Sequence, residues 1–215
     1  MRTLFVVSIA FLVTIFLCNA QTPQTHYVTV KDIAAKKIKY KGNFIQALSW
    51  EDKNGENLII LTETEMKEGK EEKDGRSKEL YAFHYIDKST NTFQQLRQIY
   101  DFEKDCPFDV MVDHVAGSLS VTDLDKDGFA EITFLYTVGC RSDVSPDVLK
   151  LMMLENGEKY AIRGRTVLYE NGSPMKDYAE TPAKVVDASF NKAPKAFLDY
   201  ANKQWEQFKI VKMGE

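Results

Sequence analysis

Residues 149–162, LKLMMLENGEKYAI, decide the fold class. Two short apolar runs, 149–154 and 160–162, lie on either side of Glu155-Asn156-Gly157-Glu158. The Asn-Gly pair favours the positive φ angles of a primed two-residue hairpin turn. The apolar runs are short for helices but suit buried strands. The stretch therefore predicts two antiparallel strands joined by a tight turn.

The same pattern of short apolar runs and turn-forming residues recurs along most of the chain. Further strands are predicted over residues 44–50, 58–61, 80–86, 93–100, 119–122, 132–138 and 166–169. Turn signals separate them, among them Asp52-Lys53-Asn54-Gly55, and the highly charged stretch 65–79 is expected to form an exposed loop. Because the strands follow one another without helices between them, we expect a mainly β fold, an antiparallel meander or a sandwich-like sheet.

One α-helix is predicted near the C-terminus. Pro194 is suited to the first turn of a helix, and Phe197, Ala201, Trp205 and Phe208 recur at intervals of four, four and three residues. This spacing places the four side chains on one helical face. We expect this apolar face to pack against the sheet.

The first 20 residues are typical of a cleavable signal peptide. Arg2 precedes an apolar run over residues 4–17, and small residues end the segment at Ala20. The run is shorter than the roughly 20 residues that a membrane-spanning helix needs, and no second run follows. We therefore expect export to the periplasm or cell surface, with no transmembrane segment after cleavage. Cys18 leaves lipoprotein processing as an alternative, although residues 15–17 are bulkier than a lipobox favours.

The remaining chain is expected to contain a disordered polar leader over 21–26 and a single β-rich domain over 27–215, which ends in the C-terminal helix. The formal net charge of the full chain is −4. Nucleic-acid binding requires a concentrated basic face, so this balance argues against a nucleic-acid partner. After removal of residues 1–20, the remaining cysteines are Cys106 and Cys140. In an oxidising compartment we expect them to form a disulfide. The alternatives are two inert thiols or a metal pair, and the second is disfavoured because there is no CxxC spacing and no nearby histidine.

The segment from Asp123 to Glu131 carries the most specific chemical pattern. Asp123, Asp125 and Asp127 alternate along it, and the glycine that follows permits a bend that points their carboxylates toward one place. The main-chain carbonyl of Phe129 and the carboxylate of Glu131 can supply further oxygens. Because Ca²⁺ takes roughly six to eight oxygen ligands, we expect these five residues to bind it. The alternative is an Asx-rich turn in which the carboxylates only accept hydrogen bonds from backbone amides.

The acidic segment has a faint counterpart earlier in the chain. Residues 49–55, SWEDKNG, precede an apolar strand, as residues 122–128, TDLDKDG, do. The repetition predicts two related strand–loop–strand units. Because Trp50 replaces the first acid, we expect no second metal site at the earlier copy.

Two further groups of side chains are candidates for chemistry. If the cysteines pair, Asp109, Arg141 and Asp143 gather around the disulfide. Two carboxylates and an arginine suit either acid/base chemistry on a glycan or a structural salt bridge. Four aromatic residues are candidates either for stacking on sugars or for core packing: Trp50, Tyr81, Phe83 and Tyr85. No nucleophile elbow, phosphate-binding loop or dinucleotide fingerprint is present.

The acidic segment resembles the calcium loops of FG-GAP and VCBS repeats, in which the motif joins two strands. An EF-hand is disfavoured, because Phe134 stands at the position of its closing glutamate. Beyond the loop, the chain resembles small exported bacterial proteins labelled surface polysaccharide biosynthesis proteins. The resemblance is carried by Trp50 with residues 55–64, Asp101-Phe102 with Cys106, 122–128 with Glu131, 140–146, Lys150 and 159–164. It implies a link to cell-surface glycan but names no reaction and supplies no catalytic residues.

Together these patterns predict a non-enzymatic, exported envelope protein that is stabilised by Ca²⁺ and supports or binds surface polysaccharide. Its expected partners are a surface glycan or other envelope proteins. Two alternatives remain open. One is an enzyme that acts on glycan with Asp109 and Asp143 as its carboxylates, and the other is a protein-interaction module of the envelope, for which residues 65–79 are a candidate surface.

Overall fold

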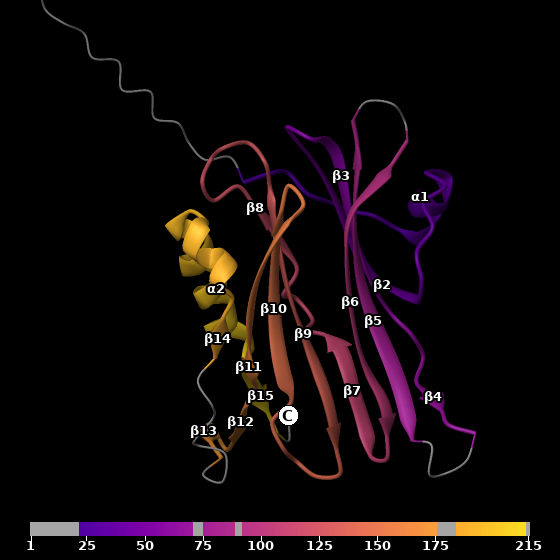
Figure 1. Cartoon of the computed structure of the whole chain (residues 1–215), viewed down its shortest axis with the longest axis vertical. Helices are drawn as coiled ribbons and strands as arrows, with labels where there is room; N and C mark the ends of the chain where they lie inside the picture. Colours follow the sequence, from indigo (N-terminus) through magenta and orange to yellow (C-terminus); the bar gives the residue numbers. More distant parts are fainter. Residues whose placement is uncertain (1–21, 71–74, 89–91, 176–183, 214–215) are drawn as a thin grey trace, which may run out of the picture.

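The computed structural model describes residues 22–70, 75–88, 92–175 and 184–213, and its strands form two facing sheets with a helix on the outer side of each (Figure 1). The expected signal peptide, residues 1–20, lies outside the described residues. The first sheet has the strand order β1-β2-β3-β5-β4, and β6 also pairs with β5. Its strands are β1 (His26–Tyr27), β2 (Asn43–Asp52), β3 (Gly55–Glu63), β4 (Lys67–Glu68), β5 (Arg76–Asp87) and β6 (Gln94–Cys106). All of its pairings are antiparallel.

The second sheet has the order β14-β11-β10-β9-β7, and β8 also pairs with β9. Its strands are β7 (Asp109–His114), β8 (Ser120–Thr122), β9 (Glu131–Arg141), β10 (Val148–Glu155), β11 (Glu158–Arg165) and β14 (Val185–Val186). Strands β10 and β11 pair as far as Glu155 and Glu158, so Asn156 and Gly157 form the predicted two-residue turn, both with positive φ. A small third sheet contains β12 (Val167–Glu170), β13 (Ser173–Pro174) and β15 (Ile210–Lys212).

The main core lies between the first two sheets. Trp50, Ile59 and Leu80 of the first sheet belong to one buried cluster with Ile132 and Phe134 of the second, and all five are at most 1% exposed. Burying a large apolar side chain contributes roughly 1.5–3 kcal/mol, so this layer dominates the packing of the two sheets. The mainly β prediction is confirmed, and the antiparallel sheets form a sandwich.

The C-terminal helix covers the outer face of the second sheet. Helix α2 (Lys195–Phe208) places Phe197, Ala201 and Trp205 in a buried cluster with Leu151 and Ile162 of the sheet. The helix and its apolar face are as the spacing predicts. A short 3-10 helix, η3 (Ala188–Lys192), precedes it and adds an aromatic ring to the same cluster.

The N-terminal segment covers the outer face of the first sheet. His26, the last residue of the leader expected to be disordered, pairs with Ser49 in β1. A short helix that the apolar periodicity does not predict, α1 (Val30–Ala35), begins after Thr29. Thr29 and Asp32 each accept a hydrogen bond from the other's backbone N–H, at 3.3 and 2.9 Å, which caps the first turn. Ile33 of this helix is 1% exposed and packs in the cluster that covers β5.

Two segments form strands where none is predicted, because their charged side chains pair with charges on neighbouring strands. They are residues 65–79, which are expected to form a loop, and β7. Residues 65–79 do not form one loop, since they include β4 and the beginning of β5. Strand β7 is also absent from the predicted strands. Lys78 of β5 pairs with Glu63 of β3 at 2.9 Å and with Asp113 of β7 at 2.5 Å. These pairs allow charged residues to continue the strands beyond the apolar runs.

One buried histidine makes stability depend on pH. His84 is 1% exposed, its Nε2 contacts Asn57 Oδ1 at 2.9 Å, and its ring stacks on Trp50 at 5.6 Å between centroids. Burial lowers the pKa of His84 to about 4, whereas an unfolded histidine titrates near pH 6.5. As the pH falls from about 6.5 to about 4, the unfolded state therefore binds a proton that the folded state does not.

We expect His84 to contribute a loss of roughly 2 kcal/mol in the free energy of unfolding between pH 7 and pH 5. Urea unfolding of the wild type and of His84→Gln at both pH values measures this contribution. Subtracting the change in the free energy of unfolding of His84→Gln from that of the wild type cancels the contribution of the other titrating groups. An identical pH dependence in both would contradict the prediction.

Candidate metal centre and binding groove

The acidic segment connects β8 to β9 and contains two turns closed by carboxylates. Asp125 Oδ1 accepts a hydrogen bond from the N–H of Asp127 at 3.2 Å, and Asp127 Oδ1 accepts one from the N–H of Phe129 at 2.7 Å. Gly128 has a φ of 87°, and a Cβ atom there would lie 2.7 Å from the Lys53 side chain. The Asx turns are therefore part of the structure, but they use one oxygen of each of these two carboxylates.

Five carboxylates converge on this segment in two overlapping groups. Asp123, Asp125 and Glu131 form one group, and Asp125, Asp127 and Glu155 form the other. Within each group, one oxygen atom per residue lies within 4.8 Å of the others. Asp125 belongs to both groups. The structure thus brings together the carboxylates of four of the five residues predicted to bind Ca²⁺.

Glu155 is the member of this cluster that the sequence analysis misses. It ends β10, in which Leu154 pairs with Ile132 of β9. This register brings the end of β10 beside the start of β9, where the acidic segment finishes. In the sequence, Glu155 only precedes the Asn-Gly turn, and no local pattern connects it to a segment more than 20 residues earlier. Glu155 can be recognised as part of the cluster only when the pairing of β10 with β9 is known.

The cluster holds negative charge that the surrounding protein compensates only in part. Glu131 is 0% exposed, and its carboxylate accepts hydrogen bonds from the N–H of Leu124 at 3.0 Å and the hydroxyl of Thr122 at 2.9 Å. Burial raises the pKa of Glu131 to about 7. Burial, followed by the neighbouring carboxylates, raises the pKa of Glu155 to about 8. Among the described residues, Asp123 Oδ1 and Glu155 Oε1 are buried without a hydrogen-bond partner.

This arrangement is suited to a divalent cation. Ca²⁺ accepts carboxylate oxygens in irregular geometry, and its charge would offset the repulsion that raises the pKa of these acids. The backbone N–H of Phe129 donates to Asp127. The main-chain carbonyl of Phe129 as a fifth predicted ligand stays a prediction.

The earlier copy of the motif lies directly against the acidic segment. The N–H of Lys53, in the turn between β2 and β3, donates to the main-chain oxygen of Gly128 at 2.9 Å, and Lys53 Nζ donates to that of Asp127. Asp52 accepts a hydrogen bond from the N–H of Ala130 at 3.1 Å. The two related units therefore meet at one end of the sandwich. In the described ranges, the acidic groups suited to a metal lie at the later copy.

A row of aromatic rings crosses the outer face of the first sheet from β5 to β6. Neighbouring rings stack with centroids 5.0–6.3 Å apart, in the order Tyr85, Phe83, Tyr81, Tyr100 and Phe102. The three rings of β5 are 4–7% exposed, whereas Tyr100 and Phe102 are 46% and 45% exposed. The row thus begins in the core and ends at the surface. All four aromatic residues that were candidates for sugar stacking, Trp50 among them, are buried and pack in the core.

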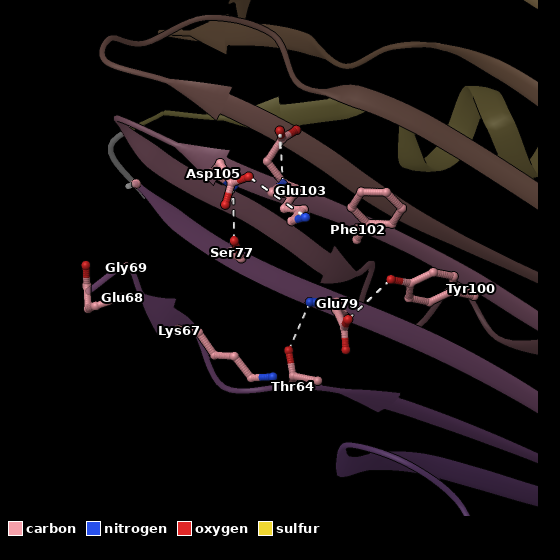
Figure 2. A pocket seen from close by; sticks show the side chains of 12 residues that line it. Thr64, Lys67, Glu68, Gly69, Ser77, Glu79, Tyr100, Phe102, Glu103 and Asp105 are labelled. Atoms are coloured by element: carbon pink, nitrogen blue, oxygen red, sulfur yellow. Dashed lines mark hydrogen bonds and ion pairs between the residues drawn. The ribbon is translucent and has the colours of Figure 1, made fainter. Parts of the chain in front are cut away.

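The exposed end of this row lines a groove of about 850 Å³ (Figure 2). Its other lining residues come from β4, β5 and β6 and from the connections next to β4. Polar and charged groups surround the two exposed rings: Thr64, Lys67, Glu68, Ser77, Glu79, Glu103, Lys104 and Asp105. The groove therefore combines flat apolar surfaces with donors and acceptors of hydrogen bonds.

Glu79 holds the aromatic part of the groove in place. Its Oε2 accepts hydrogen bonds from Lys41 Nζ at 2.6 Å and from the Tyr81 hydroxyl at 2.8 Å. Its Oε1 accepts one from the Tyr100 hydroxyl at 3.2 Å. The hydrogen bond from Lys41 lowers the pKa of Glu79, so the carboxylate is ionised at neutral pH. The Tyr100 ring is anchored through its hydroxyl, and part of its surface faces solvent.

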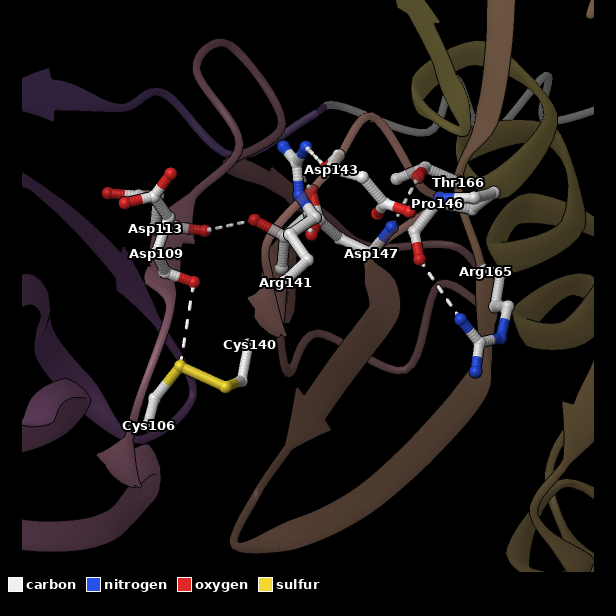
Figure 3. Close-up of polar contacts among 11 residues, drawn as sticks. Cys106, Asp109, Asp113, Cys140, Arg141, Asp143, Pro146, Asp147, Arg165 and Thr166 are labelled. Carbon is white, nitrogen blue, oxygen red and sulfur yellow. Dashed lines mark hydrogen bonds and ion pairs between the residues drawn. A yellow bond between two sulfur atoms is a disulfide. The ribbon is translucent and has the colours of Figure 1, made fainter. Parts of the chain in front are cut away.

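The predicted disulfide joins Cys106 of β6 to Cys140 of β9, with Cα atoms 5.7 Å apart (Figure 3). It links the first sheet to the second. Next to it, Arg141 Nε donates to Asp147 Oδ1 at 2.9 Å, and Arg141 Nη1 donates to the main-chain oxygen of Asp143 at 2.9 Å. The salt bridge of Arg141 is therefore made with Asp147, which the sequence analysis does not select.

The structure does not bring the two predicted acid/base carboxylates, Asp109 and Asp143, into contact with each other. Asp109 pairs with Arg76 at 3.1 Å, and its side chain is 78% exposed. Among the described residues, no hydrogen bond or ion pair joins Asp109 to Asp143. Asp147 is buried, which raises its pKa, while the neighbouring Arg141 acts in the opposite direction. This region has the geometry of a structural salt bridge.

Comparison with known proteins identifies no relative. No protein-family model matches the chain, and searches of curated proteins and of solved structures find no significant match. The resemblance to polysaccharide-related exported proteins therefore stays a prediction. In the part of the chain that the structure describes, no helix is long and apolar enough to span a membrane.

Proposed function

We propose that this chain is a non-enzymatic glycan-binding protein of the cell envelope, exported and stabilised by Ca²⁺. The observation that carries the glycan proposal is the exposed pair of rings in the groove. Tyr100 and Phe102 stack with centroids 5.4 Å apart and planes 25° from parallel. The parts of these two rings that remain exposed offer an apolar surface, on which the C–H face of a sugar ring can pack.

The polar groups around the rings support the same proposal. Sugar hydroxyls both donate and accept hydrogen bonds, and the groove offers carboxylates, such as Glu79 and Asp105, together with the hydroxyls of Thr64 and Ser77. Small-molecule sites typically occupy about 300–1,000 Å³. The groove volume of about 850 Å³ lies in the upper part of this range, so it accommodates a short oligosaccharide.

The proposed role of Ca²⁺ is structural. Strand β3 begins at Gly55, beside the turn that contacts the acidic segment, and its other end leads to Thr64 at the groove. The ion and the glycan would therefore bind toward opposite ends of the first sheet. Ca²⁺ would act by neutralising the acidic cluster and fixing the segment that contacts the β2–β3 turn of the first sheet, without touching the sugar.

We expect Tyr100→Ala and Phe102→Ala each to weaken oligosaccharide binding by about tenfold, since each substitution removes one of the two exposed rings that form the apolar surface. Isothermal titration calorimetry with cellohexaose and chitohexaose measures the affinities. Tyr27→Ala is the matched control, because Tyr27 is 81% exposed and does not line the groove.

Circular dichroism of each variant establishes that the fold is retained. No binding of either hexasaccharide by the wild type, or an equal loss of affinity in Tyr27→Ala, would contradict the glycan proposal. Release of new reducing ends from either hexasaccharide by the wild type would contradict its non-enzymatic part.

A further inference from the structure

A second pocket, of about 260 Å³, lies where β6 ends the first sheet. Beyond this strand, the inner faces of β10 and β11 are only partly covered. Four cationic side chains line the pocket from three strands: Arg97 of β6, Lys150 of β10, and Lys159 and Arg163 of β11. No sequence pattern marks any of these four residues for binding.

The cations of the second sheet stand on its core-facing side. On β11, Lys159, Ala161 and Arg163 share one face because side chains alternate along a strand. Lys150 pairs with Arg163, and Met152 pairs with Ala161. Met152 and Ala161 are buried in the main core between the sheets. The three cations therefore extend the inner face of the sheet past the core, at a place where a sandwich would ordinarily have apolar residues.

Asp101 is the one acid among the residues that line this pocket. Its Oδ2 accepts hydrogen bonds from Lys150 Nζ at 2.5 Å and from the Tyr136 hydroxyl at 2.9 Å. These contacts tie β6 to the second sheet and satisfy one of the four cations. Arg163 reaches Asp187, outside the pocket lining, at 3.6 Å.

Arg97 and Lys159 are compensated less directly, and Lys159 acts only at longer range on the Asp187 carboxylate, whose pKa it helps to lower. Arg97 Nε donates to the main-chain oxygen of Gly157 at 2.5 Å, which is a neutral acceptor. Neither Arg97 nor Lys159 forms an ion pair with a described residue. In a chain whose formal net charge is −4, this pocket gathers four cations against one acid. Like charges held close together and partly removed from water are unfavourable unless an anion joins them.

We propose that this pocket binds the phosphate group of a small ligand. A guanidinium group presents a planar fork of donors that matches phosphate oxygens, and a lysine adds a compact positive charge. Because Asp101 engages Lys150 and Asp187 engages Arg163, the lining cations left without an ion-pair partner among the described residues are Arg97 and Lys159. Two such cations suit a doubly charged phosphate better than a singly charged carboxylate. Tyr100 borders both this pocket and the aromatic groove, but the phosphate proposal does not rest on glycan binding.

Isothermal titration calorimetry of the purified protein, at constant ionic strength and without added Ca²⁺, tests the proposal with three probes. Inorganic phosphate represents the free anion, glycerol 3-phosphate represents a phosphate ester, and acetate represents a carboxylate. We expect Lys159→Gln and Arg163→Gln each to weaken phosphate binding by about tenfold. Lys195→Gln is the charge-matched control, because that side chain is 86% exposed on α2, outside the pocket.

Lys159→Gln keeps the test independent of folding, since Lys159 has no ion-pair partner among the described residues, whereas Arg163→Gln also removes the contact with Asp187. Binding of either phosphate probe that is weakened in both pocket variants and retained in Lys195→Gln supports the proposal. The tighter of the two probes distinguishes a free anion from an ester. No binding of either phosphate probe, equal weakening in Lys195→Gln, or tighter binding of acetate overturns it.

Discussion

Replacement of both Cys106 and Cys140 by alanine should lower the free energy of unfolding by about 3–4 kcal/mol. The two cysteines are 34 positions apart. In the chain-entropy model, a cross-link that closes a loop of this length restricts the unfolded chain by this amount. Urea denaturation of the oxidised wild type and of the double variant measures the difference as a shift in the transition midpoint.

Reduction of the wild type provides the control. Because a reductant opens the Cys106–Cys140 disulfide, the reduced wild type should unfold close to the midpoint of the double variant. The double variant itself should not respond to reductant. A fully reduced wild type with an unchanged midpoint would contradict the prediction.

Ca²⁺ should stabilise the wild type and should fail to stabilise Asp125→Asn. A ligand that binds only the folded state adds about 2.7 kcal/mol when its free concentration is 100 times its dissociation constant. Asp125 is the residue shared by both carboxylate groups. Asparagine retains Oδ1 as an acceptor for the N–H of Asp127, so this substitution removes a charge and preserves the turn. Thermal unfolding in EDTA and in millimolar Ca²⁺ measures the effect.

Glu155→Gln separates metal binding from the turn in a second way, because Glu155 lies outside the acidic segment. It should also reduce the stabilisation by Ca²⁺. In EDTA, both substitutions should leave stability unchanged or raise it, since each removes repulsion among the carboxylates. Asp199→Asn, which changes an exposed acid on α2, is the control and should respond to Ca²⁺ as the wild type does. An absent Ca²⁺ response in the wild type, or an equal response in Asp125→Asn, would contradict the metal proposal.

Most strands and the C-terminal helix could be predicted because their signals are local. Asn156 and Gly157 adopt the positive φ angles that their residue types favour, and this identifies the hairpin without any tertiary information. Helix α1 is also capped by a local signal, Thr29 with Asp32, but it has six residues and too few turns to show an apolar period. Its capping box was the available indication.

Both proposed binding sites, in contrast, depend on which strands become neighbours. Glu155 approaches the acidic segment because β10 pairs with β9. Arg97 meets Lys150 because β6 is held over the second sheet by the main core and by Asp101. The same holds for the salt bridge beside the disulfide, where Asp147 is the observed partner of Arg141. Contacts of this kind result from the packing of whole sheets, and spacing along the chain does not encode them in a recognisable form.

Strand β9 has a cross-link of different chemistry near each end, the proposed Ca²⁺ site and the disulfide. It begins with Glu131 at the acidic segment and carries Cys140 near its other end. A reductant opens the disulfide, and a chelator would remove the Ca²⁺ from the acidic segment if the ion binds there as proposed. If the chain is exported as proposed, both ends of the strand would be loosened in a reducing, calcium-poor compartment, and this would favour the extended chain that secretion machinery threads. Release into an oxidising, calcium-rich medium would close both cross-links, so the environment would set the time and place at which the sandwich becomes fully stable.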